Sequence, residues 1–170
     1  MNSFFRRAAI AFVASAAFAA PAAAAGSANS NMTVSANVTA NCVVSAAPMA
    51  FGAFDATSGN PGNASTSISV TCTNGLDWSA SADAGTGEGA TFAQRRLDAA
   101  VGSSQLAYNL FTDSNRSNVW GTGVEGDGVL IEDTGTGSAQ IVPIYGRIES
   151  GQTAAEVGNY SDTVQVTVSY

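Results

Sequence analysis

The chain has 170 residues, of which 13 are acidic and 6 are basic, and it contains no histidine. Without histidine, a serine or cysteine nucleophile lacks its usual general base, and the two cysteines alone make a poor zinc site. The acidic balance disfavours nucleic acid and anionic lipid as partners, because like charges repel. We therefore expect a non-enzymatic protein with no catalytic residues, no cofactor and no metal site.

Residues 1–25 have the pattern of a secretory signal peptide. Arg6 and Arg7 precede an apolar run over residues 8–20, and small residues continue to Ala25. That run is too short to span a membrane. Cleavage after Ala25 leaves four of the 6 basic residues against 13 acidic ones, a net charge of −9. We expect an exported chain without direct membrane insertion, whose remaining length suits one domain.

An alternating stretch follows over residues 31–44. Its apolar members are Met32, Val34, Ala36, Val38 and Ala40, and each is followed by Thr, Ser or Asn. Since successive side chains of a strand point to opposite faces, the stretch predicts an amphipathic strand. Alternation alone leaves two interpretations open. The stretch is either the first strand of an ordinary sandwich, packed on its own core, or a strand that packs on another copy of the chain.

The two cysteines of the chain are Cys42 and Cys72. In an exported chain they are expected to be oxidised and paired with each other. Cys42 shares its strand parity with Val44, and Cys72 shares its parity with Ile68 and Val70. Both thiols are therefore expected on the core side of adjacent strands, where a bridge is geometrically reasonable.

The rest of the chain alternates strand-like segments with turns and shows no convincing helical period. Residues 92–101 are left open between a short helix and irregular chain, and Pro143 indicates an edge position or a bulge. The Gly- and acid-rich loop over residues 122–137 matches no calcium-loop spacing. We expect strands over residues 65–73, 78–84, 106–111, 140–148 and 164–170. Short strands at this spacing predict an all-β sandwich.

Strand parity also predicts which side chains face the core. The last strand has its valines on one face, whereas Thr163, Gln165 and Thr167 face the other way. A slip of one residue would exchange the two sets, so the assignment is sharp. The predicted core residues are Phe51, Ile68, Val70, Tyr145, Val164, Val166 and Val168.

These features resemble the spore coat protein U domain family, which includes major subunits of archaic chaperone–usher pili. The resemblance covers almost the whole chain after residue 25 and keeps the family order. It starts with the alternating leader before Cys42 and departs from the family in the long loop over residues 122–137. The matching segments are Phe51-Gly52-x-Phe54, Ser69-Val70-Thr71-Cys72, Leu106-x-Tyr108-x-Leu110-Phe111, Trp120-Gly121, Pro143 to Ile148 and Gly158 to Tyr170.

The resemblance implies an incomplete immunoglobulin-like β-sandwich over residues 42–170, which lacks its final strand. Residues 26–41 are then a donor-strand extension, and its stripe from Met32 to Ala40 enters the groove of a neighbouring subunit. A periplasmic chaperone lends a strand during transit, and at the outer-membrane usher the extension of the next subunit replaces it. Such head-to-tail strand addition grows a linear fibre of this chain or related pilins. The implied role is a cell-surface fimbrium that supports attachment or biofilm formation.

Two other interpretations remain. A small outer-membrane barrel also alternates, but few segments here reach the ten alternating residues that such strands need. A self-sufficient secreted or spore-coat β-sandwich that does not form fibres fits the coat branch of the family equally well, because fold does not fix function.

Overall fold

The fold is known from a computed structural model, which describes residues 23–170. The expected signal peptide lies almost entirely outside the described residues. Within them there is no helix, and hence none that is long and apolar enough to cross a membrane. The described residues form nine strands: β1 (Cys42–Ala46), β2 (Gly62–Cys72), β3 (Asp77–Ala82), β4 (Arg95–Ala99), β5 (Gln105–Phe111), β6 (Ile131–Thr134), β7 (Gln140–Ile148), β8 (Tyr160–Ser161) and β9 (Val166–Ser169).

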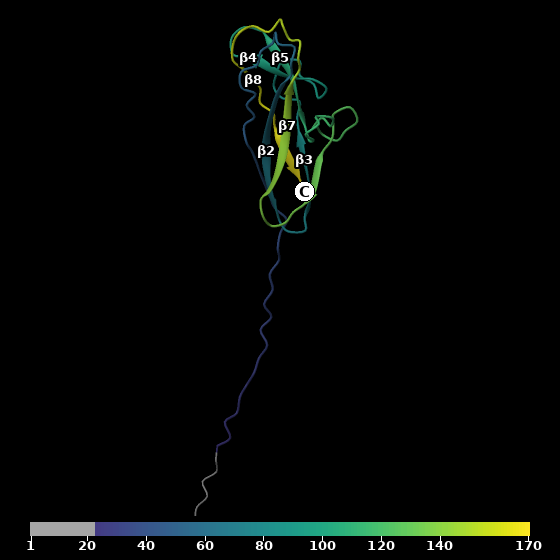
Figure 1. The fold of residues 1–170 in the computed structure, drawn as a ribbon. Coiled ribbons are helices and arrows are strands. Elements are labelled where there is room, and N and C mark those ends of the chain that lie inside the picture. Colours follow the sequence, from purple (N-terminus) through teal and green to yellow (C-terminus); the bar gives the residue numbers. More distant parts are fainter. Residues whose placement is uncertain (1–22) are drawn as a thin grey trace, which may run out of the picture. The chain divides into compact units, whose positions relative to one another are not determined.

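The chain divides into two units, residues 1–36 and residues 37–170. Within the first unit, residues 23–36 form no strand and are exposed. The second unit holds every strand described above (Figure 1). The all-β prediction is therefore confirmed. The predicted amphipathic strand is not formed as such, because only its last residues belong to β1 and residues 31–41 form none.

Two antiparallel sheets build the second unit. The larger sheet has the order β1-β2-β7-β5-β4-β8, and the smaller sheet has the order β6-β3-β9. Strands β2 and β7 lie side by side along the length of the larger sheet (Figure 1). The strands β1 and β9 each end a sheet, so each has one edge without a partner. This is an incomplete immunoglobulin-like fold, as the sequence led us to expect.

The core lies between the two sheets and follows the predicted parity. In β2, Ile68, Val70 and Cys72 are buried, and their neighbours in the chain are not. Each large apolar side chain removed from water contributes roughly 1.5–3 kcal/mol. The smaller sheet adds Trp78, Ala80 and Ala82 from β3. Further buried members of the core are Tyr108, Leu110, Trp120, Ile144 and Ile148.

The disulfide joins the first two strands at their common end. Cys42 lies directly opposite Cys72 in the β1–β2 register, and their sulfurs are bonded at 2.00 Å. Cys72 is buried, and Cys42 packs against the core with Val44. The predicted bridge is therefore formed, on the face that parity assigned to it.

Strand β7 shows how a central strand accommodates proline. It pairs with β2 along its whole length, but β5 pairs only with residues 145–148. Pro143 lies before that range, so on its β5 side the strand is locally an edge, where a missing N–H costs no ladder bond. The prediction for Tyr145 was wrong, because Ile144 and Ile148 face the core instead. Tyr145 lies half-buried on the outer face under the guanidinium of Arg116, 5.8 Å from the ring centroid.

The sequence left residues 92–101 open between a short helix and irregular chain. The structure has neither of these alone, because the segment contains a strand, β4. Its first residue, Arg95, is fully buried, and the guanidinium donates four hydrogen bonds to oxygens of three residues. Two of 2.9 and 2.6 Å go to the Asp83 carbonyl, one of 2.6 Å to Asn109 Oδ1 and one of 2.8 Å to the Trp120 carbonyl. Burial also lowers the pKa of Arg95 from its ordinary value. These bonds tie β4 and β5 to the end of β3.

Candidate functional site

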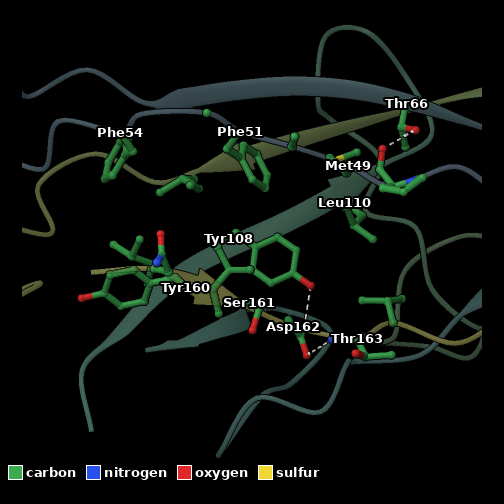
Figure 2. Close-up of a pocket in the computed structure, with 18 of the residues that line it drawn as sticks. Met49, Phe51, Phe54, Thr66, Tyr108, Leu110, Tyr160, Ser161, Asp162 and Thr163 are labelled. Carbon is green, nitrogen blue, oxygen red and sulfur yellow. Dashed lines mark hydrogen bonds between the residues drawn. The ribbon is translucent and has the colours of Figure 1, made fainter. Parts of the chain in front are cut away.

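A groove of about 1170 Å³ opens along the second unit. One bank is the segment 46–56, which continues from β1, and the other is the segment 155–166, which leads into β9. Figure 2 shows Phe51 and Phe54 on one side of the groove and Tyr160 to Thr163 on the other, with Tyr108 between them. The floor is almost wholly apolar and consists of Ile68, Leu97, Leu106, Tyr108, Leu110, Trp120, Ile144 and Ile148.

The first bank forms no strand after Ala46, where β1 ends. Thr66 Oγ1 donates to the carbonyls of Ala47 and Pro48, each at 3.1 Å, and so holds the start of the bank to β2. From residue 49 to residue 54, no backbone group bonds to another described residue. Met49, Phe51 and Phe54 nevertheless pack against the core. Backbone groups of a folded chain need partners, so this bank is able to accept them from another strand.

The second bank contains the unpaired edge of the smaller sheet. Strand β9 pairs with β3 over residues 166–169 and has no partner on its other side, and Val166 at its start lines the groove. The three valines Val164, Val166 and Val168 are half-buried against the core, whereas Thr163, Gln165 and Thr167 are exposed. The predicted parity of the last strand is therefore confirmed. Val164 and Val166 line the groove, so part of each side chain is uncovered on that side.

The Asp162 carboxylate fixes the position of this bank. It accepts hydrogen bonds from the Thr86 amide at 2.7 Å, the Thr86 hydroxyl at 3.0 Å, the Gly87 amide at 3.1 Å and the Thr163 amide at 2.7 Å. Its second oxygen accepts a 2.6 Å bond from the Tyr108 hydroxyl (Figure 2). A side chain at Gly85 would collide with this carboxylate, and the backbone there has a positive φ that suits glycine.

The floor beneath Asp162 is aromatic. The ring of Tyr108 meets that of Phe51 edge to face, with centroids 6.1 Å apart. Burial, and after it the bond to Asp162, raises the pKa of the Tyr108 hydroxyl, so that the group stays protonated. Tyr108 thus connects the two banks across the groove floor, by ring contact on one side and by hydrogen bond on the other.

Comparison with known proteins finds a family model and a solved structure that match the chain. The Spore Coat Protein U domain matches residues 28–167. The chain belongs to this family. No curated protein matches the chain significantly. Among solved structures, a match is the CsuC–CsuE chaperone–tip adhesion subunit pre-assembly complex of archaic chaperone–usher Csu pili from Acinetobacter baumannii, with a TM-score of 0.56 and 20% identity. That match covers 78% of this chain but only 40% of the matched chain.

Membership in the Spore Coat Protein U domain family makes the protein a pilin-like, non-enzymatic chain. Among the described residues, no group of three or more metal-ligating side chains comes together. The solved match, at 20% identity, supports the fold.

The predicted site residues of this family member fall into two sets. Cys42 and Cys72 are brought together in the disulfide. The stripe Met32, Val34, Ala36, Val38 and Ala40 lies in the extended segment before β1, where Met32, Val34 and Val38 are 81–87% exposed. Sequence reasoning missed Asp162 and Tyr108 as groove residues. Both stood in segments that match the family, which was the one signal that marked them.

Proposed function

We propose that the protein is a structural pilus subunit that polymerises by donor-strand exchange. In this proposal, Met32, Val34, Ala36, Val38 and Ala40 of one copy enter the groove of the next copy. A periplasmic chaperone fills the groove during transit. At the outer-membrane usher, the extension of the incoming subunit replaces the chaperone in the groove. The resulting cell-surface fimbrium would support attachment or biofilm formation.

The observation that carries the proposal is an apolar groove beside an unpaired strand edge. Strand addition works where a sheet edge offers free backbone groups and alternate side chains find pockets. The β9 edge and the bank over residues 49–54 offer the first, and the floor around Tyr108 offers the second. An edge of this kind left bare is an aggregation hazard, which gives a chaperone its physical purpose.

The extension also suits the groove in charge. The nine residues from Met32 to Ala40 would span roughly 30 Å as a strand. Residues 26–41 contain no charged side chain, although the whole chain is acidic. The extension can therefore approach an acidic neighbour without charge repulsion, and burial and backbone hydrogen bonds supply the affinity.

The test places charge on the two faces of the extension. Val34→Asp with Val38→Asp should abolish joining of subunits, because buried unpaired carboxylates are strongly unfavourable. The matched control, Ser35→Asp with Asn37→Asp, adds the same charge on the polar side and should still join. Fibres are scored by electron microscopy, and joined subunits by heat-resistant multimers on gels. Equal joining by both double variants, or multimers from a chain that lacks residues 32–40, would refute the proposal. A folded, protease-resistant monomer without fibres would instead favour a self-sufficient coat protein.

A further inference from the structure

Thr73 holds the base of the extension, residues 39–41, to the domain through its backbone amide and its hydroxyl. The Thr73 amide donates to the Asn41 carbonyl at 2.9 Å, so the β1–β2 ladder continues one step beyond the disulfide. The Thr73 hydroxyl accepts from the Asn41 amide at 3.1 Å. The hydroxyl oxygen lies 3.3 Å from the carbonyl oxygens of Thr39 and Asn41, and its single proton can be donated to either. Residues 39–41 are therefore held in line with β1.

This hold matters because the subunit carries both halves of the proposed joint. Strand β1 is an edge strand, and its free edge leads into the bank over residues 46–56. If the chain reversed through a three-residue loop at Thr39, Ala40 and Asn41, the stripe would run back along β1 as a hairpin. Val38 would then lie opposite Cys42, and the residues two and four positions before it would lie opposite Val44 and Ala46.

The parity of such a hairpin would bring the far end of the stripe into the subunit's own groove, because Val34 would lie opposite Ala46, where the groove begins. Residues directly opposite each other in an antiparallel pair lie on the same face of the sheet. Cys42 and Val44 face the core, and Ala46 lines the groove. The stripe would therefore turn its apolar side inward. Three-residue hairpin loops are common, and asparagine tolerates the left-handed conformation that their last residue adopts.

With Thr39 and Asn41 held, that hairpin is out of reach. The chain can then reverse only before Thr39, and the tightest loop, at residues 37–38, brings Met32 no further than opposite Val43. The groove begins at Ala46. We propose that Thr73 is a positioning residue whose hydroxyl prevents the extension from filling the groove of its own subunit. The extension then remains available to the groove of another copy. This inference rests on the proposed function and adds to it the reason why a subunit does not fill its own groove.

The test measures how strongly a subunit's own stripe competes for its groove. The chain from residue 26 to residue 170 is refolded by dilution with a fluorescent peptide of residues 31–41, and the apparent Kd of the peptide is determined. Thr73→Val removes the hydroxyl but keeps the shape and the amide bond to Asn41. Losing the hydroxyl bonds should raise the apparent Kd about tenfold, since self-complementation then competes. Thr73→Ser, which keeps the hydroxyl, should behave as the wild type.

A second background shows whether the effect acts through the stripe. With residues 26–38 deleted, Thr73→Val and wild type should bind the peptide equally, because no stripe remains to compete. A raised Kd in this background too would mean that Thr73 only supports the fold, and the inference would be wrong. An Asn-Gly insertion after Ala40 offers a longer loop with Thr73 untouched, and it should raise the Kd of the full chain as the valine variant does.

The role of Thr73 and donor-strand exchange can be refuted separately. An unchanged Kd for both the valine variant and the insertion variant would overturn the role of Thr73 and leave donor-strand exchange standing. If the chain without residues 26–38 does not bind the peptide at all, the groove is not an acceptor for this stripe. That result would overturn the proposed function together with the inference.

Discussion

The hydroxyl of Tyr108 donates a 2.6 Å hydrogen bond to the carboxylate of Asp162, and this bond ties the floor of the groove to its second bank. Tyr108 comes from the centre of the larger sheet, whereas Asp162 precedes the strand that ends the smaller one. The pair therefore links the centre of the larger sheet to the segment that leads into the smaller one.

Alkaline pH should weaken the fold through Tyr108. Its pKa is raised in the folded protein by burial and by Asp162, so the folded state favours the protonated phenol. That stabilisation is complete below the ordinary tyrosine pKa of 10.0 and is lost as pH rises above it. Urea unfolding should show a loss of about 1.4 kcal/mol per pH unit from this group. Tyr108→Phe should be less stable than wild type at neutral pH but lack this part of the slope. A parallel pH profile for both proteins would contradict the expectation.

Loss of the disulfide should destabilise the domain by about 3–4 kcal/mol in the chain-entropy model. The bridge joins residues with a sequence separation of 30. Removing it restores the freedom of that loop to the unfolded chain. Cys42→Ser with Cys72→Ser is compared with wild type by denaturant unfolding, and thiol titration checks that the wild type has no free thiol. A change below about 1 kcal/mol would show that the unfolded chain is already constrained.

Arg95 should be far more sensitive to replacement than its neighbour. Arg95→Met leaves the Asp83 and Trp120 carbonyls without their buried donor, and it should cost about 3 kcal/mol or more. Arg96→Met is the control, because that guanidinium bonds only the side chains of Gln94 and Gln105. It should cost under about 1 kcal/mol. The stabilities of the two variants are compared by thermal unfolding. Similar losses of stability in both would mean that the hydrogen bonds of Arg95 contribute little.

The register of the last strand predicts opposite outcomes for two adjacent positions. Val166→Asp places a carboxylate on the face that lines the groove, and it should cost about 2 kcal/mol or more. Gln165→Asp places the same charge on the exposed face and should stay within about 0.5 kcal/mol of wild type. The free energies of unfolding are compared with and without the peptide of residues 31–41. Peptide binding should widen the difference, since it covers the Val166 side.

Strands with clean alternation were predictable from sequence, and strands held by long-range contacts were not. The parity of Ile68, Val70 and Cys72 and that of the final valines is a local property, so it carried over into the structure. Strand β4 opens with two arginines, and Arg95 becomes a core residue only because acceptors from three distant segments surround it. No window of sequence contains that information. Tyr145 was misplaced, because Ile144 and Ile148 have the opposite parity and take the core face of β7.

The groove was predictable only through the family resemblance. Its banks are about a hundred residues apart in the chain, and the feature itself is an uncovered surface, which leaves no periodic signal. Alternation in the extension did predict a surface that needs a partner. It did not predict which partner, because a stripe of Met, Val and Ala fits its own core and a neighbour's equally well. The hydrogen bonds of the Thr73 hydroxyl to residues 39–41 could not be predicted from sequence either, since they depend on the hydroxyl lying opposite Asn41.

The position of the disulfide determines how a fibre of these subunits would carry mechanical load. A pull on the extension enters the domain at Asn41 and reaches Cys42 at once. The bridge passes the tension covalently to β2, which lies between β1 and β7 in the larger sheet. The weak, half-paired bank that follows β1 is thereby relieved of force, and β1 cannot be peeled away ahead of β2. Under reducing conditions the same pull would first strip β1 from the sheet and open the groove of the stretched subunit. Oxidation would therefore set the tensile strength of the fibre.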